Sequence, residues 1–472
     1  MKTAKKTNIL IFVLMLWASS SFAQSDSAYG FNYDDFINVV KRFHPVMQQA
    51  DLMLAKADAE LLGSRGAFDP VFSFDSEQKT FDGKSYYQTT NPQLKIPTWY
   101  GVEVKTGMQY FAGDNLNPDV TLGQSTYLGI SVPLARNLLL DKRRAQLQQA
   151  RLFRTQSTFE RSLLINELLR EASVAYWEWV KAQLSVRILQ DALKANEARY
   201  SLVLNSVNIG ERAAIDTVEA LTQLNQIRLN FLDARNKSLM TAAELSNYLW
   251  KKENQPYQLP AIANAQYTLQ NLSVSNLNRS GLDEILQDAA VNHPKIKATQ
   301  QKLLSLIIEK KLKYQDLLPI INLNANLLNK GYRYSFSKYG TEYARENNKF
   351  GLDIYIPLRL SKERAGYKMS KIKITETNLG LDLTKNQVTN KITYYYRELE
   401  GLINQVERCE ALLKQTRQLF SAEELKFRSG ESSQFMINAR ETKVLEVELK
   451  LAELKVKAQQ AAVNLNWAAA KW

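Results

Sequence analysis

The chain has 472 residues, a hydrophobic fraction of 45%, a formal net charge of +13 and a mean hydropathy of −0.33. The length suffices for two or three domains. The positive charge is diluted along segments rich in Glu, Gln and Lys, whereas a nucleic-acid binder would gather it in a patch, so no nucleic-acid partner is expected. Cys409 is the only cysteine, which excludes an intrachain disulfide.

Residues 1–23 have the form of a secretory signal peptide. Lysines occupy three of the first six positions, the apolar segment Ile9–Ala18 follows, and Ser21–Ala23 offers small residues for cleavage. The apolar segment is too short to cross a bilayer as a helix, and no later apolar run is long enough. If the mature protein lies in a membrane, it must do so as a closed barrel, because only helices and barrels satisfy their backbone groups there.

The sequence follows one plan twice, which predicts an internal two-fold repeat. The first repeat covers residues 24–253 and the second residues 282–472, and the linker at 254–281 is rich in residues that break regular structure. Each repeat opens with an amphipathic helix that ends at a histidine-proline pair, His44-Pro45 or His293-Pro294. Because the two histidines occupy matching positions, a structural role is favoured over catalysis or metal binding.

Segments with period-two alternation are predicted as strands at about 68–134 in the first repeat and about 319–360 in the second. A soluble sandwich with one buried face would alternate in the same way, but the signal peptide and the adjoining helices favour membrane strands. The tyrosines suit a girdle at the membrane interface. In the second repeat the apolar positions are Ile321, Leu323, Ala325 and Leu327, then Tyr332, Tyr334 and Phe336, and then Phe350, Leu352, Ile354, Ile356 and Leu358.

The strands of the first repeat are less regular. Phe72 and Phe74 begin one strand, Val102–Tyr110 forms another, and Leu128–Leu134 forms the descending one. Residues 84–97 are ambiguous. Each repeat must leave and re-enter the same side of a membrane, so its strand number should be even, and two principal strands per repeat give about four per chain.

Two long helical hairpins are predicted, at residues 136–253 and 361–472. No glycine or proline interrupts the first hairpin before Gly210, and about 70 helical residues span about 100 Å. The second hairpin contains no proline and turns at Gly430. Steps of three and four residues on both returning helices predict a coiled-coil seam. Its positions are Leu224, Ile227, Phe231, Ala234, Ser238, Thr241, Leu245 and Tyr248, and then Val444, Val447, Leu451, Leu454, Ala458, Ala461 and Leu465.

No constellation of residues suggests chemistry. The sequence has no Gly-rich phosphate loop, no cysteine pair with metal-ligand spacing and no nucleophile elbow. Its carboxylates lie mostly at helical spacing from Lys or Arg, as Glu446 does from Lys450, which is typical of surface ion pairs. We therefore expect no enzymatic activity, no cofactor and no metal.

Two features carry a family resemblance. Each descending strand ends in a matched phrase, Ser131–Leu134 before Arg144-Ala145 and Tyr355–Leu358 before Arg364-Ala365. Each hairpin tip has a helix, a glycine turn and a second helix; the tips are Asn208–Ala220 and Lys426–Glu441. In these features the chain resembles the TolC family of outer membrane efflux and secretion channels, over nearly the whole mature sequence.

The resemblance implies an α+β membrane protein that forms a homotrimeric channel. A shared transmembrane β-barrel would take about four strands from each protomer, and a long α-helical coiled-coil barrel would extend into the periplasm of a Gram-negative bacterium. The implied function is a passive exit duct of a tripartite efflux pump or type I secretion system. The implied partners are outer membrane lipid, a periplasmic adaptor (membrane fusion) protein and an inner-membrane pump of the resistance-nodulation-division or ABC type.

The resemblance also implies site residues. The adaptor would dock on the hairpin tips, at Gly210, Glu211, Arg212, Gly430, Glu431 and Ser432. Some family members close the periplasmic end with aspartates on the returning helix of the second hairpin. Phe435 and Asn438 are the nearest positions here, so an apolar or amide-lined gate is expected, with Asp216 and Glu219 of the first hairpin as the next candidates.

A different function remains open from the sequence. A structural or adhesive outer membrane protein with a coiled-coil stalk would explain the signal peptide and the long helices. It would not explain why strands are inserted twice within a helical repeat.

Overall fold

The computed structural model describes residues 30–113, 122–260, 263–274, 277, 281–331 and 346–472. The predicted signal peptide and the predicted apolar positions Tyr332, Tyr334 and Phe336 lie outside these residues. Contacts divide the chain into two units, each of which is described by itself. The hairpin unit comprises Met1–His44, Ala172–Asn276 and Leu402–Gln460, and the sheet unit comprises Pro45–Glu171, Leu277–Gly401 and Ala461–Trp472.

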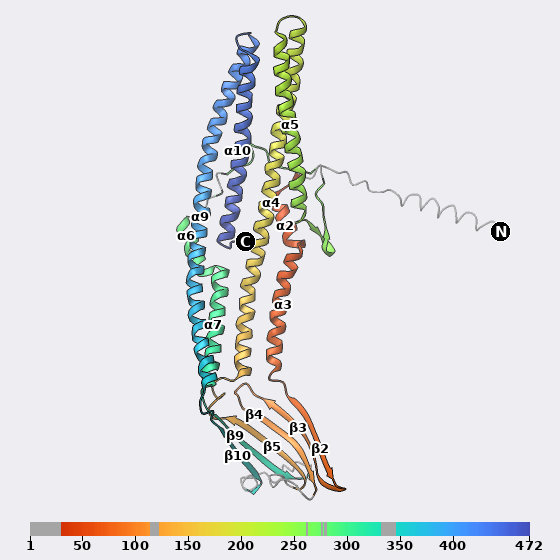
Figure 1. The fold of residues 1–472 in the computed structure, drawn as a ribbon, viewed down its shortest axis with the longest axis vertical. Coiled ribbons are helices and arrows are strands. Elements are labelled where there is room, and N and C mark those ends of the chain that lie inside the picture. The colour runs from red at the N-terminus through yellow and green to blue at the C-terminus, as the bar shows by residue number, and fades with distance from the viewer. Residues whose placement is uncertain (1–29, 114–121, 261–262, 275–276, 278–280, 332–345) are drawn as a thin grey trace, which may run out of the picture. The chain divides into compact units, whose positions relative to one another are not determined.

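Helices form most of the chain (Figure 1). The two longest, α4 and α9, have 67 and 68 residues, so each spans about 100 Å. The predicted helices on both sides of Gly210 and Gly430 are present. No helix among the described residues combines the length and apolarity needed to cross a membrane. The helices are α2 (Tyr33–Phe43), α3 (Pro45–Gly66), α4 (Lys142–Asn208), α5 (Ala214–Ser246), α6 (Leu282–Asn292), α7 (Pro294–Gln315), α9 (Ser361–Arg428) and α10 (Gln434–Ala468).

One six-stranded antiparallel sheet belongs to the sheet unit. Its strand order is β10-β9-β5-β4-β3-β2, so strands from the first repeat pair directly with strands from the second. The prediction of about four strands per chain is therefore wrong, and β2 and β10 are left as edges. The strands are β2 (Val71–Phe81), β3 (Lys84–Pro97), β4 (Glu103–Ala112), β5 (Gly123–Pro133), β9 (Ile320–Lys330) and β10 (Asn348–Tyr355).

Strand β3 arises from residues 84–97, which the sequence left ambiguous, and it pairs with β2, whose start at Phe72 and Phe74 was expected. Asp82 and Gly83 join β2 to β3 with φ angles of 52° and 71°, the left-handed conformation that a two-residue hairpin turn requires. Within β3, Gln93-Leu94-Lys95-Ile96 alternates, but Pro92 and a run of Gln, Thr and Asn dilute the signal before it. The Asp-Gly pair was the stronger indication of a hairpin.

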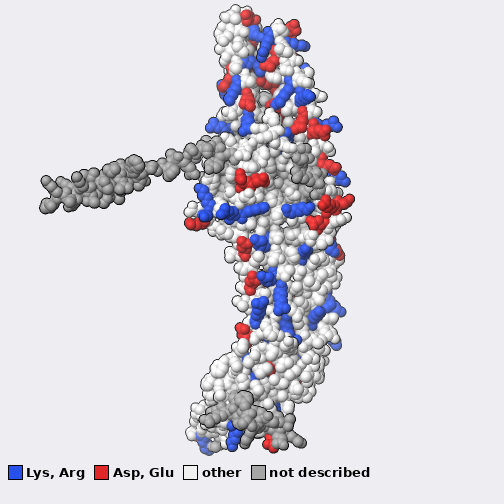
Figure 2. Space-filling view, turned by 180° about the vertical axis from the view of Figure 1, so that it is seen from behind, with Lys and Arg blue, Asp and Glu red and all other residues white. Residues whose placement is uncertain are grey.

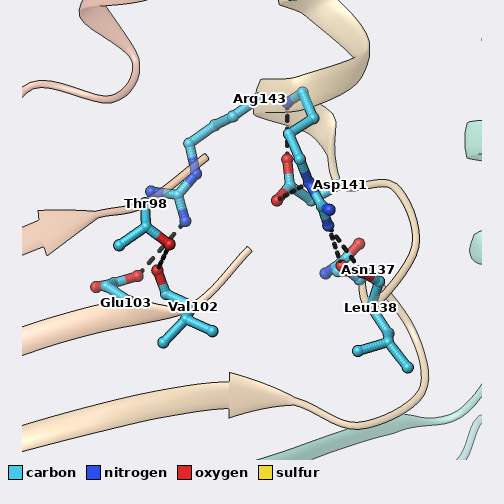
Figure 3. A network of polar contacts seen from close by, with 8 residues as sticks. Thr98, Val102, Glu103, Asn137, Leu138, Asp141 and Arg143 are labelled. Carbon is cyan, nitrogen blue, oxygen red and sulfur yellow. Dashed lines mark hydrogen bonds and ion pairs between the residues drawn. The ribbon is translucent and has the colours of Figure 1, made fainter. Parts of the chain in front are cut away.

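A polar network fixes the connection from β5 to α4 (Figure 3). Asp141 caps α4, since its Oδ1 accepts the Arg144 backbone N–H at 2.8 Å. The Arg144 side chain bonds Asp141 Oδ2 at 3.0 Å and donates to the carbonyls of Asn137 at 2.6 Å and Leu138 at 3.1 Å. Arg364, its counterpart in the matched phrase of the second repeat, is exposed. The two similar phrases therefore have different environments.

The hairpin unit has a core of large aromatic and aliphatic side chains. Tyr176 and Trp179 of α4 are fully buried, and Tyr33 of α2 stacks on Trp177 with ring centroids 5.3 Å apart. The Tyr33 hydroxyl shares a hydrogen bond of 2.9 Å with Ser173, and burial raises the pKa of Tyr33 to about 12. These contacts fix α2 against α4. On the returning helices, all seven predicted seam positions of α10 are buried.

The predicted linker is not a free tether. It contains β7 (Gln255–Pro256), which pairs with β6 (Trp250–Lys251), and β8 (Asn264–Ala265), which pairs in parallel with β1 (Gly30–Phe31). Side chains of α10 also hold it in place. Lys455 Nζ donates to the Leu269 carbonyl at 2.9 Å, and Gln459 donates to the Ser273 carbonyl at 3.0 Å.

The two histidines lie at equivalent helix ends, and each bonds the backbone at the end of a returning helix. His44 has a backbone hydrogen bond with Asn247 after α5, and His293 has one with Ala468 at the end of α10. His293 Nδ1 also accepts the Lys295 backbone N–H at 3.2 Å, which caps α7. Both rings therefore have structural partners, and each histidine precedes a proline at the first position of a helix, where proline is favoured.

We expect acid to destabilise the protein through these histidines. Burial lowers the pKa of both His44 and His293 from 6.5, and the charges of Lys295 and Lys391 lower that of His293 further. A histidine whose pKa is lower in the folded state than in the unfolded state contributes its full stabilisation at pH values above the unfolded pKa. That contribution is lost as the pH falls through the window below 6.5. The melting temperature in detergent should therefore fall from pH 7.5 to 5, and the double variant His44→Gln, His293→Gln should show a shallower slope. An equal slope in both proteins would contradict this assignment.

Candidate functional site

The sheet has one continuous apolar face. Residues directly opposite each other on paired strands point to the same side. The pairs Phe72–Leu94, Ile96–Val104, Leu128–Leu327 and Leu323–Leu352 therefore all lie on this face. Many of its side chains are exposed, including Phe72, Phe74, Met108, Leu128, Ile130, Phe350, Leu352 and Ile354. An exposed apolar surface across six strands is far larger than water-facing sheets tolerate.

The opposite face is polar and hollow. The predicted asparagines at 322, 324 and 326 lie on it, and Asn324 Nδ2 donates to Asp353 Oδ2 at 2.8 Å. A concavity of about 780 Å³ lies on this side. Its lining includes Gln93, Lys105, Tyr127, Asn324, Asn326, Lys349 and Asp353. The sheet therefore presents polar groups on one side and apolar groups on the other. The period-two alternation in both repeats predicted this two-sided arrangement.

Two glycines allow close packing on the polar face. A Cβ at Gly107 would lie 2.8 Å from the Tyr127 hydroxyl oxygen, so Tyr127 crosses β4 over this glycine and bonds Gln93 of β3. A Cβ at Gly129 would lie 1.8 Å from Asn326 Oδ1. Larger residues at either position would displace the polar side chains that line the hollow.

Charged side chains are unevenly distributed between the helices and the sheet. On the face in view in Figure 2, charged side chains are dense over the helices and sparse over the described strands. Among the described residues no group of three or more His, Cys, Asp or Glu side chains is arranged to hold a metal.

The two hairpin tips have the same turn geometry. Gly210 and Gly430 both have φ of +78°. In the first tip the Gly210 N–H bonds the Val207 carbonyl at 3.0 Å and the Glu211 N–H bonds the Ser206 carbonyl at 3.0 Å. In the second tip the corresponding bonds are 3.3 Å and 2.8 Å. This double hydrogen bond with a left-handed glycine is the Schellman motif, which ends a helix sharply.

The other predicted tip residues divide into exposed and anchored groups. Glu211 and Glu431 are exposed, as are the two glycines. Arg212 instead lies on the second hairpin, with its guanidinium carbon 3.9 Å from the centre of the Phe427 ring. Ser432 donates to Glu423 of the preceding helix. The apolar side chains Ile209, Ile215 and Val218 near the first tip are exposed.

The two candidate gate residues occupy different environments. Phe435 is 67% exposed, so within its own chain it is not a core residue. Asn438 is 8% exposed, and its Oδ1 accepts a hydrogen bond from Gln434 Nε2 at 2.9 Å. Asp216 lies within 3.9 Å of Arg212, and Glu219 is partly exposed.

A buried ion pair joins the two hairpins, and no pattern in the sequence predicted it. Arg199 of α4 forms two hydrogen bonds with the Glu441 carboxylate of α10, at 2.7 and 3.1 Å. Asn196 Nδ2 donates to Glu441 Oε1 at 2.9 Å. Only 12% of the Arg199 side chain and 8% of the Glu441 side chain are exposed. Helical spacing identifies neighbours on one helix, but these partners lie 242 positions apart.

No family model and no curated protein matches the sequence. Solved structures do match the fold. The CmeC outer membrane channel of Campylobacter jejuni aligns with a TM-score of 0.62 and 13% identity, over 93% of this chain and 85% of that one. The outer membrane protein VceC of Vibrio cholerae gives 0.64 and 12%, over 93% and 95%. The MtrE outer membrane channel of Neisseria gonorrhoeae, in its open state, gives 0.63 and 13%, over 92% and 88%.

The chain has the fold of the TolC-like outer membrane channels. Within this TolC-like fold, the six-stranded sheet provides the apolar and polar faces, and the two long hairpins end in matching Schellman turns. The similarity spans nearly the whole chain at low sequence identity, so the fold is shared where most side chains differ.

Proposed function

We propose that this protein is the exit duct of an efflux system in the outer membrane, through which solutes pass without chemical change. The observation that carries the proposal is the sheet with one exposed apolar face and one concave polar face. In a membrane the apolar face would contact outer membrane lipid, and the polar face would line a water-filled path. The similar structures are those of outer membrane channels, which supports the same assignment.

The sheet of one chain cannot enclose a pore of its own. Its edges, β2 and β10, run in opposite directions because the strand number is even, so copies of the chain can pair edge to edge in a fully antiparallel barrel. The resemblance to the TolC family implies that three copies of the chain assemble into a homotrimer. Three six-stranded sheets would form a barrel of about eighteen strands, wider than the barrel expected from four strands per chain.

Reconstitution into liposomes tests this function. Liposomes that carry the purified protein and a trapped, impermeant dextran should swell in an isotonic sugar solution as the sugar enters through the pore, and native mass measurement in detergent should give three copies. An adhesive or structural outer membrane protein would insert without making the liposomes permeable. Liposomes that stay impermeable with the inserted wild type and with Phe435→Ala, the variant at the predicted gate, would contradict the proposal, as would a monodisperse monomer in mild detergent.

We further propose that the hairpin tips face the periplasm and dock an adaptor, which connects the duct to an inner-membrane pump of the resistance-nodulation-division or ABC type. The exposed glutamates Glu211 and Glu431 and the exposed apolar side chains beside the first turn offer a mixed surface for such a partner. The matched geometry of the two turns would let six similar tips form one docking ring in a trimer.

Replacing Gly210 or Gly430 with valine should reduce export at least about tenfold while the barrel still assembles. A β-branched residue at a φ of +78° is strained by about 1–3 kcal/mol, so the turn should rearrange. No atom lies within 4 Å of the added Cβ, so the effect would come from the backbone and not from a clash. Asparagine, which tolerates this conformation better, is the matched control. Normal export by both valine variants would refute the docking assignment.

The gate is the last part of the proposal. An open duct would leak periplasmic solutes, so a constriction is needed, and Phe435 is an exposed aromatic residue one position after the start of α10. Three copies of Phe435 around an axis could exclude ions by dewetting. Asn438 would support this position through its bond to Gln434.

Phe435→Ala should raise the resting conductance severalfold and leave the melting temperature within about 1 °C, because an exposed side chain contributes little to the fold. Met436→Ala, at the neighbouring position, is the control. If Phe435→Ala lowers stability without changing conductance, the residue packs against another copy and the gate lies elsewhere, with Asp216 and Glu219 the next positions to test.

A further inference from the structure

A row of lysines crosses the polar face of the sheet. Lys95 of β3 is paired with Lys105 of β4, and Lys105 is paired with Gly129 of β5. Gly129 pairs in turn with Asn326, and Asn326 with Lys349 of β10. Direct cross-strand partners lie on the same face, so the three lysines share one transverse row, and Lys105 and Lys349 both line the hollow.

This arrangement is electrostatically unfavourable for the isolated sheet. Lys95 and Lys105 are directly opposite, with Cα atoms about 5 Å apart, and like charges in that position destabilise a strand pair. Neither ammonium group has a carboxylate within ion-pair distance among the described residues. Lys349 lies about 14 Å from Lys105 across three strand spacings. The row thus concentrates positive charge at a place where it lowers the stability of the strand pairing.

The acidic residues of the polar face that the structure describes do not form ion pairs with Lys95 or Lys105. Glu103, the nearest along β4, pairs with Arg143 at 3.5 Å, and Asp353 accepts the hydrogen bond of Asn324 four positions from Lys349 along β10. Asp75 pairs across the strand with Asn91, toward the other end of the sheet. Further charged side chains on the six strands are Glu77, Lys79, Lys84 and Lys330, and Glu346, just before β10, also lines the hollow.

We propose that the lysine row makes the duct selective for anions, so that its exported solutes are small organic anions that carry carboxylate or phosphate groups. This inference rests on the proposed function, because the polar face must line the pore. In a trimer Lys95 and Lys105 alone would contribute six ammonium groups around one water-filled path. Rings of basic side chains favour anions in other pores because they lower the energy of a negative ion and raise that of a positive one.

The test is the reversal potential across a planar bilayer that separates tenfold different KCl concentrations. The potential is defined at zero current, so even a mostly closed duct yields a value. The wild type should prefer chloride to potassium. The double variant Lys95→Gln, Lys105→Gln should lower the permeability ratio at least about twofold, and Lys105→Glu should lower it further. Lys105→Arg should keep it.

Lys84→Gln is the matched control, since it removes one lysine from the same sheet at the β2–β3 turn, outside the row. Native mass measurement confirms that each variant still assembles. Potassium preference in the wild type, or a ratio that the double variant leaves unchanged, would overturn the inference and leave the duct itself intact. Absence of any current from both the assembled, inserted wild type and Phe435→Ala would instead overturn the proposed function.

Discussion

Replacing Leu128 with arginine is expected to remove most of the protein from the outer membrane. Leu128 lies in the middle of β5, on the apolar face between Thr106 and Leu327, and is 48% exposed. An arginine on the lipid side of a barrel costs about 2–4 kcal/mol near the bilayer midplane. A trimer would bear this cost in each copy. Immunoblots of outer membrane fractions should show at least a tenfold loss of the assembled protein.

Ser131→Arg is the control on the same strand. Ser131 lies on the polar face, paired with Glu103 and Asn324, where a new guanidinium would meet water and a carboxylate. This variant should reach the outer membrane at nearly the wild-type level. If Ser131→Arg is lost and Leu128→Arg is retained, the polar face contacts lipid and the assignment of the two faces is reversed. Equal recovery of both variants would mean that neither face lies in a membrane.

Glu441→Ala should destabilise the hairpin unit by about 3–5 kcal/mol, because it leaves the Arg199 guanidinium buried without its carboxylate. The same change removes the acceptor of the Asn196 amide. Thermal unfolding in detergent should show a markedly lower melting temperature, and proteolysis should cut the hairpins first. Because the removed ion pair connects the two hairpins, the variant should also impair the arrangement of the tips that adaptor docking needs.

Glu446→Ala on the same helix provides the comparison. Glu446 pairs with Lys443 at 3.0 Å, but both side chains are 59% exposed, so this pair should contribute less than about 0.5 kcal/mol. The double variant Arg199→Met, Glu441→Leu should recover much of the lost stability, because apolar residues of similar size avoid an unpaired buried charge. Equal melting temperatures for Glu441→Ala and Glu446→Ala would show that the buried pair does not hold the hairpins together.

The long helices and the strand alternation of the second repeat could be predicted because each depends on local pattern. A stretch without breakers and a period of two are properties of neighbouring residues, and α4, α9, β9 and β10 follow from them. The start of β2 was expected at Phe72 and Phe74, but β3 was left ambiguous because Pro92 and its polar neighbours weaken the alternation. Its Asp82-Gly83 turn was a usable signal.

The remaining features depend on partners far apart in the chain. The pairing of β5 with β9, the bond from Arg199 to Glu441 and the attachment of the linker to Lys455 all join segments whose separation no spacing rule covers. The lysine row has the same origin, because Lys95, Lys105 and Lys349 become neighbours only through the strand register. Local sequence therefore predicts the elements, and the register determines the site.

Single-channel recording tests the central claim most directly. The purified oligomer in a planar bilayer should give discrete current steps, small in the wild type and several times larger in Phe435→Ala. Such steps require a continuous water-filled path through the assembled sheets and helices. An oligomer that inserts into the bilayer but passes no current in either form would contradict the claim that this protein is a channel.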